Sequence, residues 1–273
     1  MRNIQPQQPT VVLLHSSASA ARQWDRLAET LRPRFQVRAI DFHGHGEQST
    51  WRGNAPMALA DEAALAIPAL EEAGGAHVIG HSYGGAVALK LATMRPRLVH
   101  SLVVYEPVLF RLVLDETVHQ SPAQGISAVA GLMRRVLATD GASAAAQLFI
   151  NFWSGAGAWE SLPPGKQASI APRMHAVVQH FDALLNEPLQ LSELARLRMP
   201  VMSVSGARTP DVTRRIAALL RTALPTDAHE VIEAAGHMGP ITHSAEFNQR
   251  VVRFLDMQRE HSGPVLEALS AAA

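Results

Sequence analysis

The sequence predicts an α/β protein with a mostly parallel, doubly wound sheet and a helical segment inserted near the middle of the chain. Short runs rich in Val, Ile and Leu alternate with longer amphipathic segments, which is typical of βαβ units. The alternation stops between residues 107 and 199, where no comparable strand-like run occurs. The 273 residues are 47% hydrophobic, so a sizeable core can form.

Strands are expected where the apolar runs are short enough to be buried on both faces of the sheet. These runs are Val11–Leu14, Val37–Ile40, His77–Ile79, Leu102–Val104, Val201–Val204 and Glu230–Ile232. Helices are expected over the amphipathic segments Gln23–Leu31, Ala58–Glu72, Gly85–Met94, Val212–Ala223 and Ala245–Gln258. Pro68 lies inside the second of these helices, and we expect it to kink or split that helix.

The residues from 107 to 199 contain apolar stretches that are broken by proline and glycine, as in Leu162-Pro163-Pro164-Gly165. Such a pattern favours helices joined by loops, and the segment is too long for a simple connection between two strands. We therefore expect a core domain formed by residues 1–106 and 200–273. Residues 107–199 are expected to form a helical lid over the ends of the strands.

The composition argues against several classes of partner and chemistry. The formal net charge is zero, which gives no electrostatic footprint for nucleic acid or for an anionic membrane. There are no cysteines, which excludes disulfides and thiolate sites and fits a cytoplasmic protein. No histidines and carboxylates show the helical spacing of a zinc site, so we expect no metal and no cofactor. The polar start Met1–Pro6 and the short run Val11–Leu14 predict no targeting segment, and the Ala-rich tail Ser262–Ala273 is expected to fray or form a short helix.

A candidate nucleophile follows the third expected strand, in the run Gly80-His81-Ser82-Tyr83-Gly84-Gly85. The small residues on either side let the backbone make a tight turn from strand to helix, with the serine side chain above the sheet. The bare Gly-x-Ser-x-Gly pattern is weak, and the alternative is a glycine-rich turn with an incidental serine. Its position between a strand and a helix favours Ser82 as a nucleophile.

Four segments in order give the chain a resemblance to the α/β-hydrolase family over nearly its whole length. Leu13–Ser17 resembles the strand end that supplies an oxyanion-hole amide, and Asp41–Ser49 resembles the family's Asp-x-x-Gly-His-Gly-x-Ser loop with one extra residue. The serine turn is the third segment. Ala235–Met238 is the fourth, where the family keeps its general base. The resemblance implies the α/β-hydrolase fold and a serine nucleophile.

The resemblance also implies roles for individual residues. Ser82 would attack, and His237 would remove the proton of its hydroxyl. The amides of Tyr83 and Ser17 would stabilise the negative oxygen of the tetrahedral intermediate. Ser16 stands where the family usually has glycine, so its hydroxyl is expected near the substrate.

Other histidines in these segments are interpreted as structural rather than catalytic. They are His15, His43, His45 and His81. His243 is the alternative base, although a role at the start of the last helix is favoured for it.

The acid that orients His237 is expected at one of two places. In most of the family it follows the strand seen here as Val201–Val204, but Thr209 occupies the matching position and cannot serve as a charged partner. Glu106 stands directly after another strand, at a place where some family members carry the acid, and is favoured. Asp211, displaced by two residues from the usual position, is the alternative.

Aromatic residues of the expected lid are candidates for an apolar acyl pocket, although packing of the lid on the core is an equally good interpretation. Phe110, Phe152 and Trp153 are taken as substrate-binding residues, and Phe149 and Trp159 belong to the same group. Arg111, Arg134, Arg135 and Arg173 are candidates for binding a carboxylate, or are ordinary exposed charges.

The sequence therefore predicts a serine hydrolase that acts through an acyl-enzyme on a small or medium ester, a thioester or a carbon–carbon bond of the diketone type. One alternative is a cofactor-free perhydrolase or lyase on the same framework. Another is a weakly active binding or receptor-like protein, which Thr209 favours. The expected partner is a small-molecule substrate, and the chain is expected to be a monomer or a homodimer.

Overall fold

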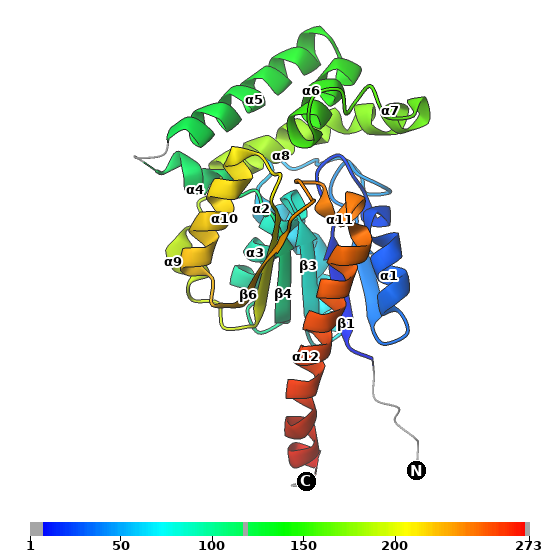
Figure 1. Cartoon of the computed structure of the whole chain (residues 1–273), viewed down its shortest axis with the longest axis vertical. Coiled ribbons are helices and arrows are strands. Elements are labelled where there is room, and N and C mark those ends of the chain that lie inside the picture. Colours follow the sequence, from blue (N-terminus) through cyan, green and yellow to red (C-terminus); the bar gives the residue numbers. More distant parts are fainter. Residues whose placement is uncertain (1–7, 117–119, 271–273) are drawn as a thin grey trace.

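A six-stranded sheet in the order β2-β1-β3-β4-β5-β6 forms the centre of the computed structural model, which describes residues 8–116 and 120–270 (Figure 1). Every neighbouring pair of strands is parallel. The strands are β1 (Thr10–Leu14), β2 (Gln36–Ile40), β3 (Ala76–His81), β4 (Val99–Tyr105), β5 (Val201–Gly206) and β6 (Thr226–Ile232). All six expected strands are present, so the predicted parallel sheet is confirmed. The expectations for Met1–Pro6 and for residues 271–273 lie outside the described residues.

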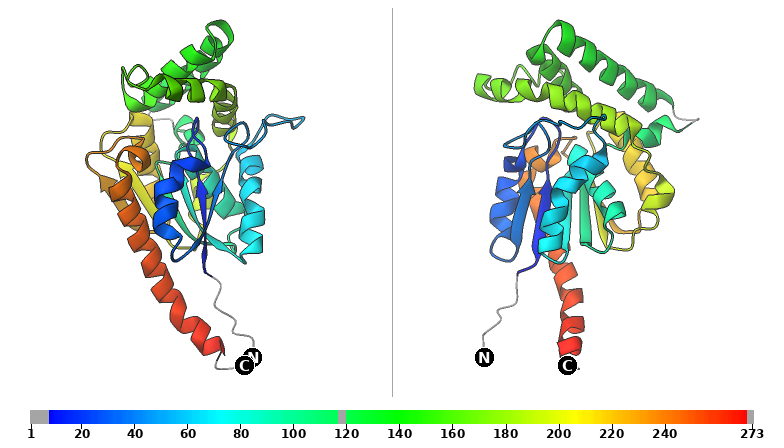
Figure 2. Two further views of the ribbon diagram at one scale, coloured as in Figure 1. Left: turned by 90° about the vertical axis from the view of Figure 1, so that its right-hand side faces the viewer. Right: turned by 180° about the vertical axis from the view of Figure 1, so that it is seen from behind.

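Helices cover both faces of this sheet (Figure 2). The side chains of strand β1 alternate between two apolar clusters, one on each face of the sheet, and each cluster needs helices to cover it. Val11 and Leu13 belong to the cluster that includes residues of α1 (Asp25–Leu31) and α12 (Ser244–Ser270). Val12 and Leu14 belong to the cluster that includes residues of α2 (Leu59–Glu72), α3 (Tyr83–Met94) and α10 (Asp211–Ala223). The fold is therefore doubly wound, as predicted.

Two helices differ from their predicted form. The helix α2 continues through Pro68 without being split. Its buried residues Ala63, Ala66 and Leu70 belong to the same apolar cluster as α3, and this packing offsets the hydrogen bond that the proline cannot make. The helix α12 runs to Ser270, well beyond the predicted end at Gln258.

The segment between β4 and β5 is helical in its described part and contains no strand there. Figure 1 shows its longer helices above the carboxyl ends of the strands. Its elements are α4 (Phe110–Leu114), α5 (Gln120–Thr139), α6 (Ala142–Ser154), α7 (Pro164–Ile170), η2 (Ala171–Arg173), α8 (Met174–Asn186) and α9 (Leu191–Leu194). We call this segment, residues 107–199, the helical insertion. Its apolar residues share one cluster with α2 and α3. It therefore packs continuously onto the rest of the described chain, residues 8–106 and 200–270, which we call the sheet domain.

The remaining short elements are η1 (Ala21–Trp24), which precedes α1, and α11 (Gly239–Thr242), which precedes α12. Among the described helices, none has the length and apolar character needed to cross a bilayer.

Candidate active site

Ser82 lies on the turn between β3 and α3, with a left-handed backbone conformation of φ 56° and ψ −115°. Two glycines make this turn possible. A Cβ on Gly80 would lie 2.3 Å from the carbonyl oxygen of Gly84, and a Cβ on Gly84 would lie 2.3 Å from that of Leu14. Such contacts are far inside van der Waals separation, so both positions require glycine.

Backbone strain is concentrated around this turn. Among residues 8–116 and 120–270, the non-glycine residues with positive φ are Ala18, Ser82 and Glu106. Each such conformation costs on the order of 1 kcal/mol and persists only where the surroundings enforce it. All three residues stand just beyond the carboxyl ends of strands, β1 for Ala18, β3 for Ser82 and β4 for Glu106. The strain therefore marks one site.

A chain of hydrogen bonds joins three of the predicted site residues. The Nε2 atom of His237 lies 2.8 Å from Oγ of Ser82, and its Nδ1 atom lies 2.7 Å from Oε2 of Glu106. All three side chains are buried. When Nδ1 carries the proton and donates a hydrogen bond to Glu106, Nε2 is left as the acceptor for the serine hydroxyl. The geometry thus allows the imidazole to take the proton of Ser82.

Glu106 is held by two further donors. The amide of Gly206 donates to Oε1 at 2.8 Å, and the hydroxyl of Thr209 donates to Oε2 at 2.6 Å. Asp211, the alternative acid, is not brought to His237, because it begins α10 with an exposed side chain that pairs with Arg214.

A second polar chain braces His237 through its backbone. The ring of His81 donates from Nε2 to the carbonyl oxygen of His237 at 2.8 Å, and its Nδ1 accepts from the side-chain amide of Gln23 at 3.0 Å. Burial lowers the pKa of His81 to about 3, with the neighbouring His237 adding to this effect, so the ring is neutral. Gln23 in turn accepts from the amide of Ser16 at 3.0 Å and from its hydroxyl at 2.8 Å.

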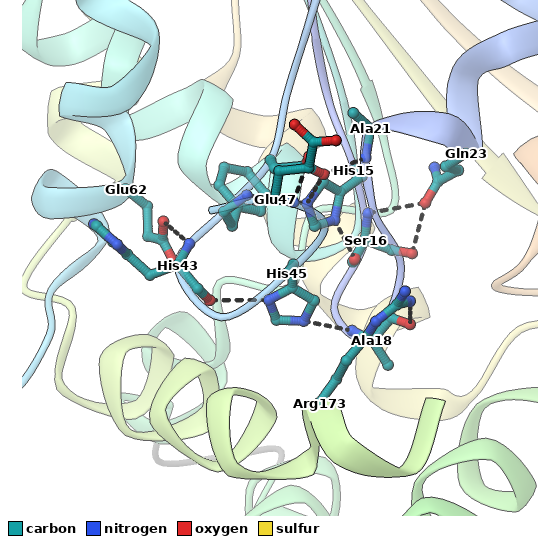
Figure 3. A network of polar contacts seen from close by, with 12 residues as sticks. His15, Ser16, Ala18, Ala21, Gln23, His43, His45, Glu47, Glu62 and Arg173 are labelled. Carbon is teal, nitrogen blue, oxygen red and sulfur yellow. Dashed lines mark hydrogen bonds and ion pairs between the residues drawn. The ribbon is translucent and has the colours of Figure 1, made fainter. Parts of the chain in front are cut away.

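The loop after β1 is fixed by two neutral histidines (Figure 3). Burial lowers the pKa of His15 and of His45 to about 3. His15 accepts from the amide of Phe42 at 3.1 Å, so its Nδ1 donates to the carbonyl oxygen of Ser16 at 2.7 Å. His45 accepts from the amide of Ala18 at 3.2 Å. The structural interpretation of both residues agrees with these contacts.

The two residues predicted to supply amides both contact His180 of the helical insertion. The ring of His180 stacks on Tyr83, with centroids 3.7 Å apart and planes 5° apart. Its Nδ1 atom lies 2.8 Å from Oγ of Ser17. Its Nε2 atom lies 3.4 Å from Oε1 of Glu62, whose pKa is raised by burial to about 7. The amide of Tyr83 has no partner within α3, because Tyr83 is the first residue of that helix.

A cavity of about 640 Å³ lies between the sheet domain and the helical insertion, and it reaches Ser82 and His237. Both Ser16 and Ser17 line it on the sheet side. Apolar lining comes from the insertion and from α11, through Phe149, Ile150, Trp153, Leu162, Ile170 and Ile241. Over the described residues no group of three or more histidine and carboxylate side chains is arranged as metal ligands.

Of the three aromatic residues predicted to bind substrate, Trp153 lines this cavity. Its ring stacks on His237, with centroids 4.1 Å apart and planes 27° apart. Phe110 and Phe152 are not among the lining residues; both pack against Trp153 instead. Phe149 replaces them, because it lies four positions before Trp153 on the same face of α6. The spacing of four residues between Phe149 and Trp153 is the sequence signal that could identify this pair.

Three contributors to the site carry no signal in a single sequence. Gln23, His180 and Glu62 come from separate elements and become neighbours only in the folded chain. His243, the alternative base, contacts Thr242 at 2.9 Å and precedes α12.

The parallel sheet, the strained serine turn and the histidine beyond the last strand define an α/β-type hydrolase. The chain belongs to the alpha/beta hydrolase family, whose sequence model matches residues 11–250.

Sequence identity to individual relatives is either low or confined to part of the chain. A pimeloyl-[acyl-carrier protein] methyl ester esterase of Aeromonas hydrophila is 26% identical over 261 residues, covering 91% of this chain and 96% of the esterase. Lipase LipV of Mycobacterium tuberculosis is 40% identical over 100 residues, and this match spans 36% of either chain. A crystal structure of a hydrolase from Pseudomonas aeruginosa PA01 superimposes with a TM-score of 0.75 at 23% identity, covering 92% of this chain and 91% of that one. The last similarity concerns the fold alone.

Proposed function

We propose that this protein is a serine hydrolase that cleaves a small or medium ester through an acyl-enzyme. The observation that carries the proposal is the buried chain from Ser82 through His237 to Glu106, which opens onto the cavity. Esterases among the relatives support the same reaction class. A thioester or a diketone-type carbon–carbon bond would use the same nucleophile.

In the first half of the reaction, Oγ of Ser82 attacks the carbonyl carbon while its proton passes to Nε2 of His237. Glu106 accepts a hydrogen bond from Nδ1 and stabilises the positive charge that forms on the ring. The negative oxygen of the tetrahedral intermediate accepts hydrogen bonds from the backbone amides of Tyr83 and Ser17. The imidazolium then gives its proton to the departing alkoxide.

In the second half, the acyl group occupies Ser82 and a water molecule takes the place of the alcohol. His237 removes a proton from this water, which attacks the acyl carbon, and the same proton then returns to Oγ of Ser82 as the acid leaves. No cofactor takes part in either half. The apolar lining of the cavity accommodates the acyl chain and limits access of water.

The helical insertion, residues 107–199, acts in this proposal as the lid of the site. Trp153 covers one face of His237, and His180 covers the ring of Tyr83. The feature that favours a binding protein is Thr209 at the usual position of the acid. Its hydroxyl donates to Glu106, which supplies a carboxylate to His237 from another strand.

Labelling with a fluorophosphonate tests the proposal, because this reagent forms a covalent adduct with an activated serine. We expect one adduct, located on Ser82 by peptide mass spectrometry, and hydrolysis of a panel of neutral carboxylic esters. The matched variant Ser82→Ala should give neither. If the wild-type protein forms no adduct and hydrolyses no ester, the proposed function is wrong, whatever the fold.

A further inference from the structure

Three cationic side chains line the cavity that contains Ser82. They are Arg22 of η1, Lys166 of α7 and Arg173 of η2. Asp25 is the single carboxylate among the described lining residues. The chain as a whole has no net charge, so this excess of positive charge is local. The other lining residues are mainly apolar or carry hydroxyl groups, so these three cations supply most of the charge in the cavity.

In the part of the chain that the structure describes, none of the three cations forms an ion pair with a carboxylate. Within residues 8–116 and 120–270, no carboxylate oxygen lies within 4.0 Å of their nitrogen atoms. Two other arginines of the helical insertion do have carboxylate partners, since Arg111 pairs with Asp115 at 2.8 Å and Arg134 pairs with Asp182. Arg135 is exposed, and of the four arginines proposed from the sequence as carboxylate ligands, Arg173 is the one that lines the cavity.

Arg173 is the most constrained of the three. It is partly buried, and its Nη1 atom donates to the carbonyl oxygen of Ala18 at 2.8 Å (Figure 3). Burial lowers its pKa, and the positive charge of Arg22 lowers it further. Asp41 attracts the guanidinium, but its own oxygens accept from the amides of Ala21 at 2.7 Å and Glu47 at 3.2 Å.

Two guanidinium groups that line one cavity repel each other, and an anion that contacts both would relieve this repulsion. Arg22 approaches from the sheet domain and Arg173 from the helical insertion, so one anion between them would contact both parts of the molecule. Guanidinium groups suit this task, because their planar donors match the oxygens of carboxylate and phosphate.

We propose that the cavity binds a substrate with an anionic group, a carboxylate or a phosphate, held between Arg173 and Arg22 with Lys166 beside them. This inference rests on the proposed function, since it assigns the substrate class of the same site. The ester bond then lies at Ser82, and the charged end of the substrate lies toward η1 and η2. A charge at the far end distinguishes such a substrate from the simple neutral ester of the same length.

Two pairs of probes distinguish where the anion stands in the substrate. The first pair compares monomethyl esters of straight-chain dicarboxylic acids, from succinate to suberate, with the same esters carrying an amide in place of the carboxylate. The second pair compares an acetate ester of glycerol phosphate with glycerol monoacetate. We expect kcat/KM to favour the anionic member of one pair by about tenfold or more, as for a charge-assisted hydrogen-bonded pair.

The ratio of kcat/KM between the two members of a pair is the quantity to follow in variants, because a loss of folded protein cancels in it. In Arg173→Gln and in Arg22→Gln we expect this ratio to fall toward one. Arg173→Lys should keep part of it. Arg32→Gln is the matched control, because Arg32 is exposed just after α1 and does not line the cavity.

The possible failures are separable. A wild-type enzyme that hydrolyses the neutral esters without preferring either anionic probe would overturn this inference and leave the serine hydrolase intact. A preference that survives both Arg173→Gln and Arg22→Gln would overturn it as well. If no ester is hydrolysed and Ser82 takes no fluorophosphonate, the proposed function itself is wrong.

Discussion

The hydroxyl of Thr209 donates a 2.6 Å hydrogen bond to Oε2 of Glu106, the same oxygen that lies 2.7 Å from Nδ1 of His237. A residue at the position of the family's usual acid therefore contacts a carboxylate that comes from a different strand. The hydroxyl of Thr213 lies 2.6 Å from that of Thr209 and extends the same network. The two threonines and Glu106 are all buried, so each of these bonds is protected from water.

The first prediction concerns which carboxylate serves His237. Glu106→Gln should lower kcat by about a thousandfold or more, because an amide cannot stabilise the imidazolium and allows the wrong tautomer of the ring. Asp211→Asn is the matched control and should leave kcat close to that of the wild type, since Asp211 is exposed and paired with Arg214. Steady-state kinetics on a neutral ester provides the measurement. The opposite ranking of the two variants would show that the acid is misassigned.

The second prediction concerns the role of Thr209 itself. Thr209→Val keeps the shape of the side chain and removes the hydroxyl, so Glu106 loses one donor while keeping its charge. We expect kcat to fall by about tenfold, with KM for a neutral ester little changed, because a hydrogen bond to a charged group contributes about 1.5–3 kcal/mol. Thr209→Ser should recover most of the loss. A normal kcat for Thr209→Val would mean that Gly206 alone is sufficient to hold the carboxylate.

A third prediction uses the short distance between these two residues. In Glu106→Ala, the removed side chain leaves room beside His237, and Asp at position 209 would place a carboxylate there. The double variant Glu106→Ala/Thr209→Asp should therefore be at least about tenfold more active than Glu106→Ala. The single variant Thr209→Asp should be less active than the wild type, because two buried carboxylates would repel each other. Additive losses in the double variant would argue against this relocation.

Much of this site follows from patterns that are local in the sequence. The serine turn is visible because its glycines, its strand and its helix are contiguous, and the position of His237 follows from the resemblance to the family. Glu106 is harder to predict, because the residues next to it in the sequence do not indicate that the ends of β4 and β6 bring it to His237. His180 and Arg173 lie in the helical insertion, whose docking on the sheet domain depends on packing between distant residues. Phe110 and Phe152 were interpreted as lining residues because aromaticity alone does not say which face of a helix meets the cavity.

The fourth prediction addresses Trp153, which lines the cavity and stacks on His237. Trp153→Ala should raise KM and lower kcat, because the substrate loses an apolar wall and the imidazole loses the ring that holds one of its faces. Trp153→Phe preserves an aromatic surface and should be affected less in both parameters. Phe152→Leu is the matched control on the same helix, as Phe152 is outside the cavity lining. Equal effects of Trp153→Ala and Phe152→Leu would point to a general loss of packing.

The fifth prediction is that the folded protein is sensitive to acid. Burial lowers the pKa to about 3 for four histidines, which are His15, His45, His81 and His180, and to about 4 for His77. In the unfolded chain these groups titrate near pH 6.5, so below that pH the unfolded state binds more protons and the free energy of unfolding falls as pH falls. Each histidine contributes about 1.4 kcal/mol per pH unit, and Glu62, whose pKa is raised to about 7, offsets about one of these contributions. The remaining dependence should unfold a domain of ordinary stability by about pH 4–5. Urea titrations between pH 8 and pH 5 measure how steeply the free energy of unfolding changes with pH. This dependence should become weaker, by the equivalent of about one proton, in His77→Gln, which is remote from Ser82, and stay unchanged in the exposed control His175→Gln. A free energy of unfolding that is independent of pH would refute the prediction.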